Sequence, residues 1–127
     1  MDGLAARTVL IVEDEWLVRM ELVAAFEDAC CTVLESTSVE DALGSLYARQ
    51  QSGAPVDLLV TDIRLNGTLT GWDLAEAVRG LDTAIAVIYV SANPPAAGRG
   101  VPGSVFIDKP ALMAQVIAAA HRLLDHA

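Results

Sequence analysis

Short runs of apolar residues recur along the chain and predict the strands of a buried sheet. The first run, TVLIV at residues 8–12, is nearly continuous and rich in β-branched side chains. Four more runs occupy residues 31–36, 56–62, 83–92 and 104–109. Runs of this length and composition are typical of strands that are covered on both faces, as in a parallel sheet. We therefore expect five strands.

The segment between the first two runs predicts an amphipathic helix. Residues 15–29 contain no Gly or Pro. Their apolar residues recur at steps of three and four along one helix face, namely Trp16, Met20, Val23 and Phe26. We expect this face to be buried, with Trp16 in a packing role.

Capping signals indicate two further helices. Ser38 is followed three residues later by an acid, and the helix that it opens is expected to run to about residue 51. Thr70 is followed by Asp73 in the same way, and Gly80 is expected to close that helix. Each of these helices stands between two predicted strands.

A fourth helix is predicted at the C-terminal end of the chain. Pro110 stands where proline is tolerated, in the first turn of a helix. The residues that follow form a stripe at helical spacing, consisting of Leu112, Val116, Ala120 and Leu123. We expect this stripe to be buried against the sheet.

Strands and helices alternate, which predicts an α/β domain with a parallel sheet and helices on both faces. One helix is missing from the alternation. The segment SANPPAAGRGVPG, residues 91–103, holds three of the five prolines and three of the nine glycines. Both residue types disfavour a helix interior. We expect residues from about 94 to 103 to form no helix, or at most one short turn.

Length and charge restrict the class of protein. At 127 residues the chain suits one domain, and a net charge of −9 argues against nucleic acid as a partner. No apolar run approaches the ~18 residues needed to cross a bilayer, and the first residues do not form a secretory signal. Cys30 and Cys31 are adjacent and are expected to be reduced thiols. We expect a cytoplasmic protein without a membrane partner.

Four of the predicted strands end in residues that can do chemistry: Glu13 and Asp14, Asp62, Ser91 and Lys109. Ligands of open parallel sheets bind outside the carboxyl ends of the strands, where the strand order reverses. If the first and third strands are neighbours, three carboxylates converge there and their repulsion favours a bound cation. Oxygen ligands of this kind suit Mg²⁺.

The motifs LIVEDE, LLVTDIRLNG, YVSA and FIDKP, in this order and at the ends of these strands, resemble those of the receiver domain of two-component response regulators. The resemblance spans about residues 8–125. It implies a flavodoxin-like, doubly wound sheet of five parallel strands in the order 2-1-3-4-5. Because the chain ends at its last predicted helix, we expect a single receiver domain over residues 1–127, with its core at 8–125 and no output domain.

The resemblance assigns the phosphoacceptor and the metal site. Asp62 is expected to accept a phosphoryl group from a phosphohistidine on a sensor histidine kinase or a histidine phosphotransfer protein. Glu13, Asp14, Asp62 and the backbone carbonyl of Arg64 are expected to hold Mg²⁺. Asp14 alone would also suit the start of a helix as an N-cap.

The remaining roles concern binding of the phosphoryl group and switching. The resemblance implies that Ser91 and Lys109 bind the phosphoryl oxygens, and that the Lys109–Pro110 peptide is cis. Phe106 stands where the family has its switch aromatic, although a core aromatic explains this residue equally well. The output is expected to be altered binding to a downstream protein.

Some residues depart from the family pattern. The first acid is Glu13 where Asp is commoner, and its longer arm is suited to act through a metal-bound water. Asn66 replaces a usual proline, in a loop that is one residue longer before Gly71. Arg64 is placed to lie over a phosphoryl group on Asp62 and to change how fast it is hydrolysed.

Other functions stay open at this point. The chain suits a stand-alone receiver, and its start at Met1 and short ends favour a complete protein over a fragment of a longer regulator. A phosphatase with an aspartyl nucleophile typically carries an acid two residues later, where this chain has Arg64. A receiver-like protein that binds partners without phosphorylation is disfavoured by the complete set of pocket residues. We therefore expect a phosphoacceptor rather than a turnover enzyme.

Overall fold

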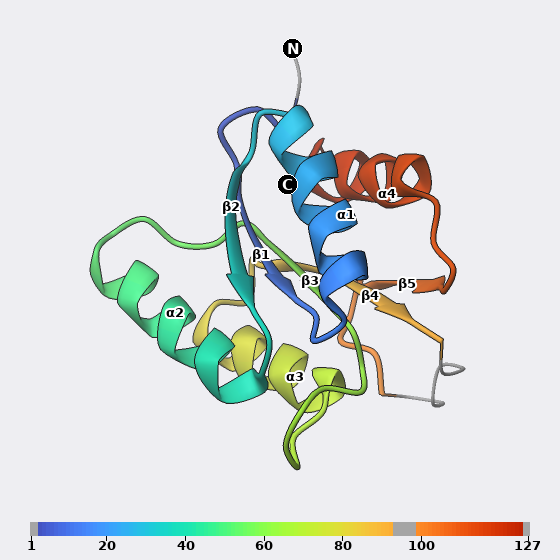
Figure 1. The fold of residues 1–127 in the computed structure, drawn as a ribbon. Helices are drawn as coiled ribbons and strands as arrows, with labels where there is room; N and C mark the ends of the chain where they lie inside the picture. The colour runs from blue at the N-terminus through green and yellow to red at the C-terminus, as the bar shows by residue number, and fades with distance from the viewer. Residues whose placement is uncertain (1–2, 93–98, 126–127) are drawn as a thin grey trace.

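The computed structural model of the chain describes residues 3–92 and 99–125. Within these residues one parallel sheet runs through the molecule with the strand order β2-β1-β3-β4-β5 (Figure 1). The strands are β1 (Thr8–Val12), β2 (Thr32–Ser36), β3 (Leu58–Thr61), β4 (Ala86–Ser91) and β5 (Val105–Asp108). All the strand pairs are parallel. The predicted fold and strand order are confirmed.

Helices cover both faces of the sheet (Figure 1). They are α1 (Trp16–Asp28), α2 (Val39–Gln51), α3 (Gly71–Leu81) and α4 (Met113–Asp125). Side chains of α1 and α4 enclose one hydrophobic cluster, and side chains of α2 and α3 enclose the other. β1 and β3 are wholly buried between these two layers, which accounts for their continuous apolar runs.

The predicted buried face of α1 is wrong in its first turns. Trp16 is 59% exposed and Met20 is 53% exposed, whereas Leu22 and Phe26 are buried. The error arises because α1 carries apolar residues on several sides, so that helical spacing alone fits more than one face. Packing against the sheet selects the face that contains Leu22 and Phe26.

The other helices need smaller corrections. Leu112 precedes α4 and is 72% exposed, while Val116 and Ala120 are buried as predicted. Gly80 does not close α3, because the helix continues through Leu81. The start of α3 is as predicted: Thr70 forms a reciprocal capping box with the third helical residue.

Residues 99–104 form no helix between β4 and β5, as predicted for this part of the segment. The rest of that prediction, residues 94–98, lies outside the described residues. Val101 is buried and its backbone N–H donates to the Tyr89 hydroxyl at 3.2 Å. Tyr89 in turn packs against Trp72, with ring centroids 4.6 Å apart. The aromatic side chains and Val101 thus cover the sheet here.

Two compositional expectations concern thiols and membranes. Cys30 is exposed and Cys31 is half-buried, and neither is in a disulfide, which agrees with the expected reduced thiols. The Cys31 thiol donates to the Leu4 carbonyl at 3.3 Å. Across residues 3–92 and 99–125, no helix has the length and apolar character that a membrane span requires.

Candidate functional site

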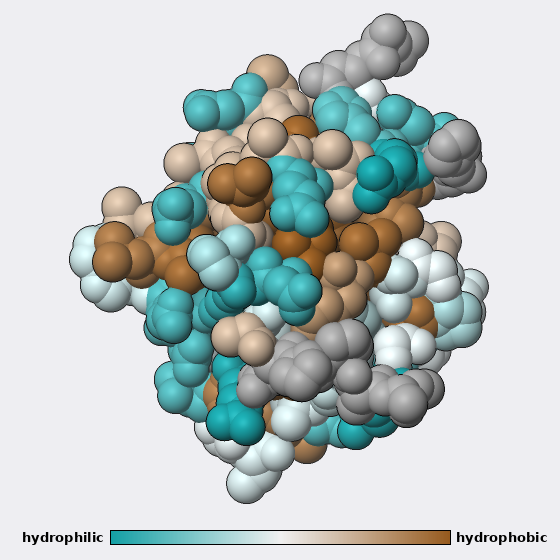
Figure 2. All heavy atoms as spheres, turned by 90° about the vertical axis from the view of Figure 1, so that its right-hand side faces the viewer, coloured by the Kyte–Doolittle hydropathy of each residue, from teal (hydrophilic) through white to brown (hydrophobic). Residues whose placement is uncertain are grey.

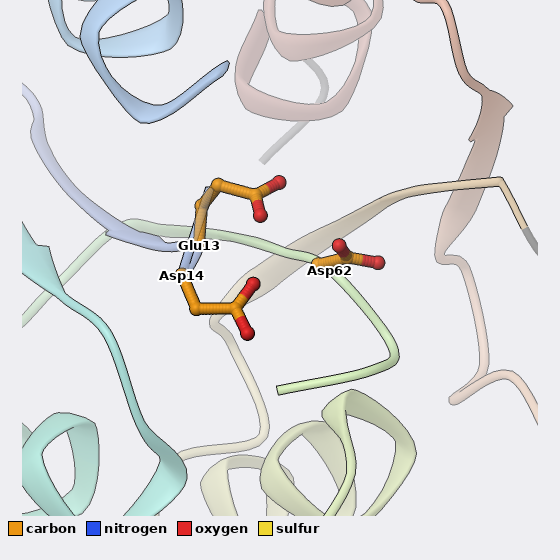
Figure 3. A group of neighbouring side chains, drawn as sticks. All are labelled: Glu13, Asp14 and Asp62. Atoms are coloured by element: carbon orange, nitrogen blue, oxygen red, sulfur yellow. The ribbon is translucent and has the colours of Figure 1, made fainter. Parts of the chain in front are cut away.

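The acidic residues converge because β1 and β3 are neighbours. The two strands pair in register up to Val12 and Thr61, so the residues that follow them emerge at the same edge of the sheet. Glu13 and Asp14 follow β1, and Asp62 follows β3 (Figure 3). One carboxylate oxygen from each of the three side chains lies within 4.8 Å of the others. The predicted acidic cluster is present.

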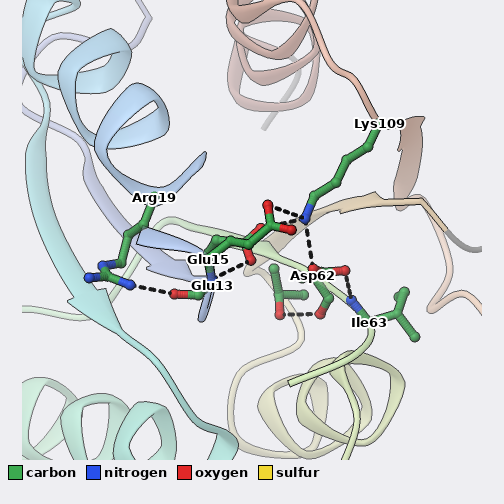
Figure 4. Close-up of polar contacts among 7 residues, drawn as sticks. Glu13, Glu15, Arg19, Asp62, Ile63 and Lys109 are labelled. Carbon is green, nitrogen blue, oxygen red and sulfur yellow. Dashed lines mark hydrogen bonds and ion pairs between the residues drawn. The ribbon is translucent and has the colours of Figure 1, made fainter. Parts of the chain in front are cut away.

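Both carboxylate oxygens of Asp62 accept hydrogen bonds. Oδ1 accepts the backbone N–H of Ile63 at 2.6 Å, and Oδ2 accepts a hydrogen bond from Lys109 Nζ at 2.8 Å (Figure 4). The backbone N–H of Asp62 donates to Val12 at 3.0 Å. The residue is only 8% exposed. Its carboxylate therefore has a fixed orientation at the end of β3.

The backbone beyond Asp62 is packed against the start of α3. Gly71 N–H donates to the carbonyl of Ile63 at 2.7 Å. A Cβ atom on Gly71 would lie 2.0 Å from the carbonyl oxygen of Asp62, which is far inside van der Waals contact. The carbonyl of Asp62 also accepts the Thr61 hydroxyl at 2.7 Å. Only glycine at position 71 permits this backbone arrangement.

Lys109 supplies the positive charge of the site. Its Nζ lies 2.9 Å from Glu13 Oε1 and 2.8 Å from Asp62 Oδ2, and its side chain is 14% exposed. Burial by itself lowers the pKa of Lys109, but the hydrogen bonds from Lys109 to Asp62 and Glu13 outweigh it and raise the pKa. The ammonium group stays charged beside the carboxylates. The Lys109–Pro110 peptide is cis, as predicted.

Glu13 is the most deeply buried of the three acids. Burial raises its pKa to about 7, against the opposing hydrogen bonds from Lys109 and from the Glu15 backbone. Glu15 N–H donates to Glu13 Oε2 at 3.1 Å. Arg19 donates to the Glu13 carbonyl at 2.9 Å and so ties α1 to the end of β1 (Figure 4).

An open pocket of about 530 Å³ lies over the acidic cluster. Seven polar or charged residues and one alanine line it: Asp14, Glu15, Asp62, Arg64, Asn66, Ser91, Lys109 and Ala92. Ser91 is fully buried at the end of β4 and its carbonyl accepts the Lys109 N–H at 3.0 Å. The structure thus places Asp62, Ser91, Lys109 and Arg64 around one space.

Sequence reasoning did not include Glu15 and Asn66 among the site residues. Glu15 directly follows the acidic pair, and this adjacency was the available signal. Asn66 was noted only for the geometry of its loop. That loop pairs with the start of α2, through a bridge between Ser38 and Asn66. No sequence pattern indicated this contact.

Phe106 lies on β5 and packs against other aromatic rings. Its ring centroid is 6.2 Å from that of Trp72 and 6.4 Å from that of Tyr89. The three rings belong to α3, β4 and β5. Phe106 is therefore part of an aromatic cluster beside the segment that replaces a helix.

The donor set fits Mg²⁺. The three clustered side chains offer only carboxylate oxygens, the hard ligands that Mg²⁺ prefers, and the pocket above them leaves room for its water ligands. Three carboxylates so close together also need compensating positive charge. Lys109 supplies part of this charge in the structure.

The sequence pattern of the response regulator receiver domain matches residues 9–121. The chain belongs to this family. No curated protein matches the sequence at a significant level.

Solved receiver structures share the fold over nearly the full length of this receiver chain. A response regulator receiver protein from Sinorhizobium medicae is 33% identical, with a TM-score of 0.85 and with 94% of this chain and 95% of that chain covered. A putative response regulator from Chloroflexus aurantiacus is 23% identical, with a TM-score of 0.80 and coverage of 94% and 98%. A signal receiver domain of a Pseudomonas fluorescens HD domain-containing protein has 17% identity, a TM-score of 0.84 and coverage of 95% and 96%.

Proposed function

We propose that this receiver domain accepts a phosphoryl group on Asp62 from a phosphohistidine of a histidine kinase or phosphotransfer protein. Residues 8–125 act as one receiver unit, and its output is altered binding to a downstream protein. The observation that carries the proposal is the setting of Asp62. Its carboxylate lies at the floor of an open pocket, between Lys109 and two further acids.

The transfer uses the Asp62 carboxylate as the nucleophile. A carboxylate oxygen forms a bond to phosphorus while the bond from phosphorus to the histidine nitrogen breaks, and the electron pair leaves with the imidazole. Lys109 Nζ, 2.8 Å from Asp62 Oδ2, is placed to stabilise the negative charge on the phosphoryl oxygens. Ser91 lines the same pocket and is assigned to hydrogen-bond the attached phosphoryl group.

Glu13, Asp14 and Asp62 are the side chains that would hold Mg²⁺, together with the backbone carbonyl of Arg64. When bound, Mg²⁺ would supply positive charge to the phosphoryl oxygens and relieve the repulsion among the three carboxylates. Glu13 is buried and faces Lys109, so it suits a role through a water on the metal.

An apolar surface next to the pocket suits the donor protein. Trp16, Leu17 and Met20 on the first turns of α1 are exposed. A second hollow of about 450 Å³, between α1 and the start of α4, shares Glu15, Ala92 and Lys109 with the first pocket. Figure 2, which faces the side of α4 and β5, shows hydrophobic surface gathered near the centre of this side. A protein that docks there brings its phosphohistidine close to Asp62.

A small phosphodonor tests the proposal without the natural kinase. The protein is incubated with acetyl phosphate and Mg²⁺, and intact mass is recorded. We expect an adduct of one phosphoryl group that is stable in acid, labile in base and absent from Asp62→Asn. Asp57→Asn is not a suitable control because Asp57 accepts the Thr8 N–H at 2.8 Å. The exposed Asp41→Asn provides the matched change and keeps the adduct.

The alternatives give different results. Absence of any adduct under these conditions contradicts the proposal and favours a receiver that binds partners without phosphorylation. Release of phosphate over many turnovers per minute favours a phosphatase. Phosphatases with an aspartyl nucleophile typically carry an acid two residues after it. This chain has the exposed Arg64 at that position, which weighs against a phosphatase.

A further inference from the structure

Glu15 is not explained as a helix cap. It occupies the N-cap position of α1, but its side chain makes no capping hydrogen bond. Glu is also not among the residues favoured at this position, which are Ser, Thr, Asp and Asn. The first turn of α1 contains no acid, so Glu15 interacts with the helix dipole, but an exposed charge there contributes only about 0.3–1 kcal/mol. Capping therefore does not account for Glu15.

The Glu15 carboxylate lies at the rim of the phosphoacceptor pocket. Its Oε2 is 3.9 Å from Lys109 Nζ, and its side chain is 64% exposed (Figure 4). Its backbone N–H is bonded to Glu13 Oε2, which fixes the start of α1 relative to the acidic cluster. Glu15 lines the pocket together with Arg64 on another loop. A phosphodonor that enters the pocket passes this carboxylate.

Glu15 adds negative charge where negative charge is already in excess. Lys109 is in contact with Glu13 and Asp62 at 2.9 and 2.8 Å, so its charge is already engaged there. A rim carboxylate repels an approaching anion, and the repulsion grows with the charge of that anion. A protein donor escapes this penalty if it carries a Lys or Arg that meets Glu15 as the phosphohistidine enters.

We propose that Glu15 is a specificity-determining residue that disfavours free anionic phosphodonors and favours a protein donor with a basic side chain beside its phosphohistidine. This inference rests on the proposed function of Asp62. Glu15 acts through its charge at the pocket entrance and takes no part in forming or breaking a bond.

The test compares Glu15→Gln with the native protein. Phosphorylation rates are measured by intact mass with acetyl phosphate and with the less negatively charged phosphoramidate. Each variant is saturated with Mg²⁺, as determined by titration of its tryptophan fluorescence. We expect Glu15→Gln to raise the rate with acetyl phosphate about three- to tenfold at low salt, and to raise the rate with phosphoramidate less. High salt is expected to reduce the difference.

Three further variants separate charge from structure. Glu15→Asp keeps the charge and should keep most of the discrimination between the two donors. Glu15→Ser removes the charge and supplies a favoured N-cap, so it gives the same test if Glu15→Gln does not fold. Glu27→Gln makes the same charge change at the other end of α1, about 18 Å along the helix, and should leave both rates unchanged.

The outcomes are distinct. The inference is overturned if the native protein is phosphorylated and Glu15→Gln shows an unchanged or lower rate with acetyl phosphate. An equal rise with both donors that persists at high salt also overturns it, because such a rise would come from repositioning of Lys109. If the native protein gains no phosphoryl group from either donor, the proposed function fails and the inference fails with it.

Discussion

Lys109 compensates two of the buried acids at the sheet edge. Lys109 bridges Glu13 and Asp62, and Asp62 also accepts a backbone N–H. These contacts keep buried charges paired, which burial of ionised groups requires. Asp62 still lines the open pocket, and Arg64 lines the same pocket.

Arg64 is predicted to lengthen the life of the phosphorylated state. It is exposed and lines the pocket above Asp62, so its guanidinium is placed to pair with phosphoryl oxygens and to hinder the approach of water. We expect phosphoryl-Asp62 to decay several-fold faster in Arg64→Ala. Intact mass against time after removal of the donor measures the decay. Arg122→Ala, an exposed change on α4, is the control, and equal lifetimes in all three proteins would remove the hypothesis.

Gly71 is predicted to be required for the position of Asp62. A methyl group at this residue would lie 2.0 Å from the Asp62 carbonyl oxygen, so the backbone of one of the two segments must move. We expect Gly71→Ala to lower the free energy of unfolding by about 1–3 kcal/mol, in the range of other overpacked sites. Phosphorylation by acetyl phosphate should slow as well, because Asp62 is displaced.

Gly80→Ala is the matched control in the same helix. A Cβ atom at Gly80 meets no heavy atom within 4 Å, and alanine favours a helix interior over glycine by about 0.5–1 kcal/mol. Gly80→Ala should therefore raise the free energy of unfolding in urea and leave phosphorylation unchanged. Comparable losses of stability in both variants would contradict the role assigned to Gly71.

Among the secondary-structure elements, residues 99–104 take the place of a helix and are held by specific contacts. Arg79 on α3 donates to the Pro102 carbonyl at 2.7 Å. Arg99 forms ion pairs with Asp73 and Glu76, also on α3. Val101 fills the space over Tyr89. α3 and β4 therefore fix this segment without a regular helix.

Tyr89 is predicted to anchor this segment. Its buried hydroxyl accepts the Val101 N–H at 3.2 Å, and its burial also raises its pKa, so the hydroxyl stays neutral. Tyr89→Phe leaves that N–H without this acceptor and should cost about 1–2 kcal/mol of unfolding free energy. Tyr47→Phe, on the exposed side of α2, should cost almost nothing. Chemical denaturation measures both, and equal effects would contradict the anchoring role.

Strands were easier to predict from the sequence than helix faces. The runs around β1 and β3 are apolar throughout because both faces of these strands are buried. The face of α1 was mispredicted because Trp16 and Met20 have the same spacing as residues that are buried. A helix buries different apolar residues at different orientations to the sheet. The spacing of apolar residues within one helix does not determine that orientation.

In the molecule as a whole, the topology brings together residues that are far apart in the sequence. The order β2-β1-β3-β4-β5 makes β1 and β3 neighbours, so Asp14, Asp62 and Lys109 meet at one edge. These residues were predictable because each lies two positions after the last apolar residue of a predicted strand. Gly71, Glu15 and Asn66 were not assigned to the site, since their roles depend on close approaches and pocket geometry that no local pattern records.

Mg²⁺ is predicted to stabilise the whole domain. The fold holds three carboxylates within 4.8 Å in a chain of net charge −9, and unfolding separates them. A cation that binds only the folded state stabilises it by RT ln(1 + [L]/Kd), about 2.7 kcal/mol at a hundredfold excess over Kd. We therefore expect millimolar Mg²⁺ to raise the melting temperature by several degrees.

The control for this effect must separate binding from general screening of charge. NaCl at matched ionic strength should produce a smaller rise. Asp14→Asn removes one proposed ligand while leaving the ion pairs of Lys109 with Glu13 and Asp62, so it should abolish most of the specific rise without unfolding the protein. If Mg²⁺ and matched NaCl shift the melting temperature equally, the acidic cluster does not bind the ion. Asp14 would then be better explained as an acid at the start of a helix.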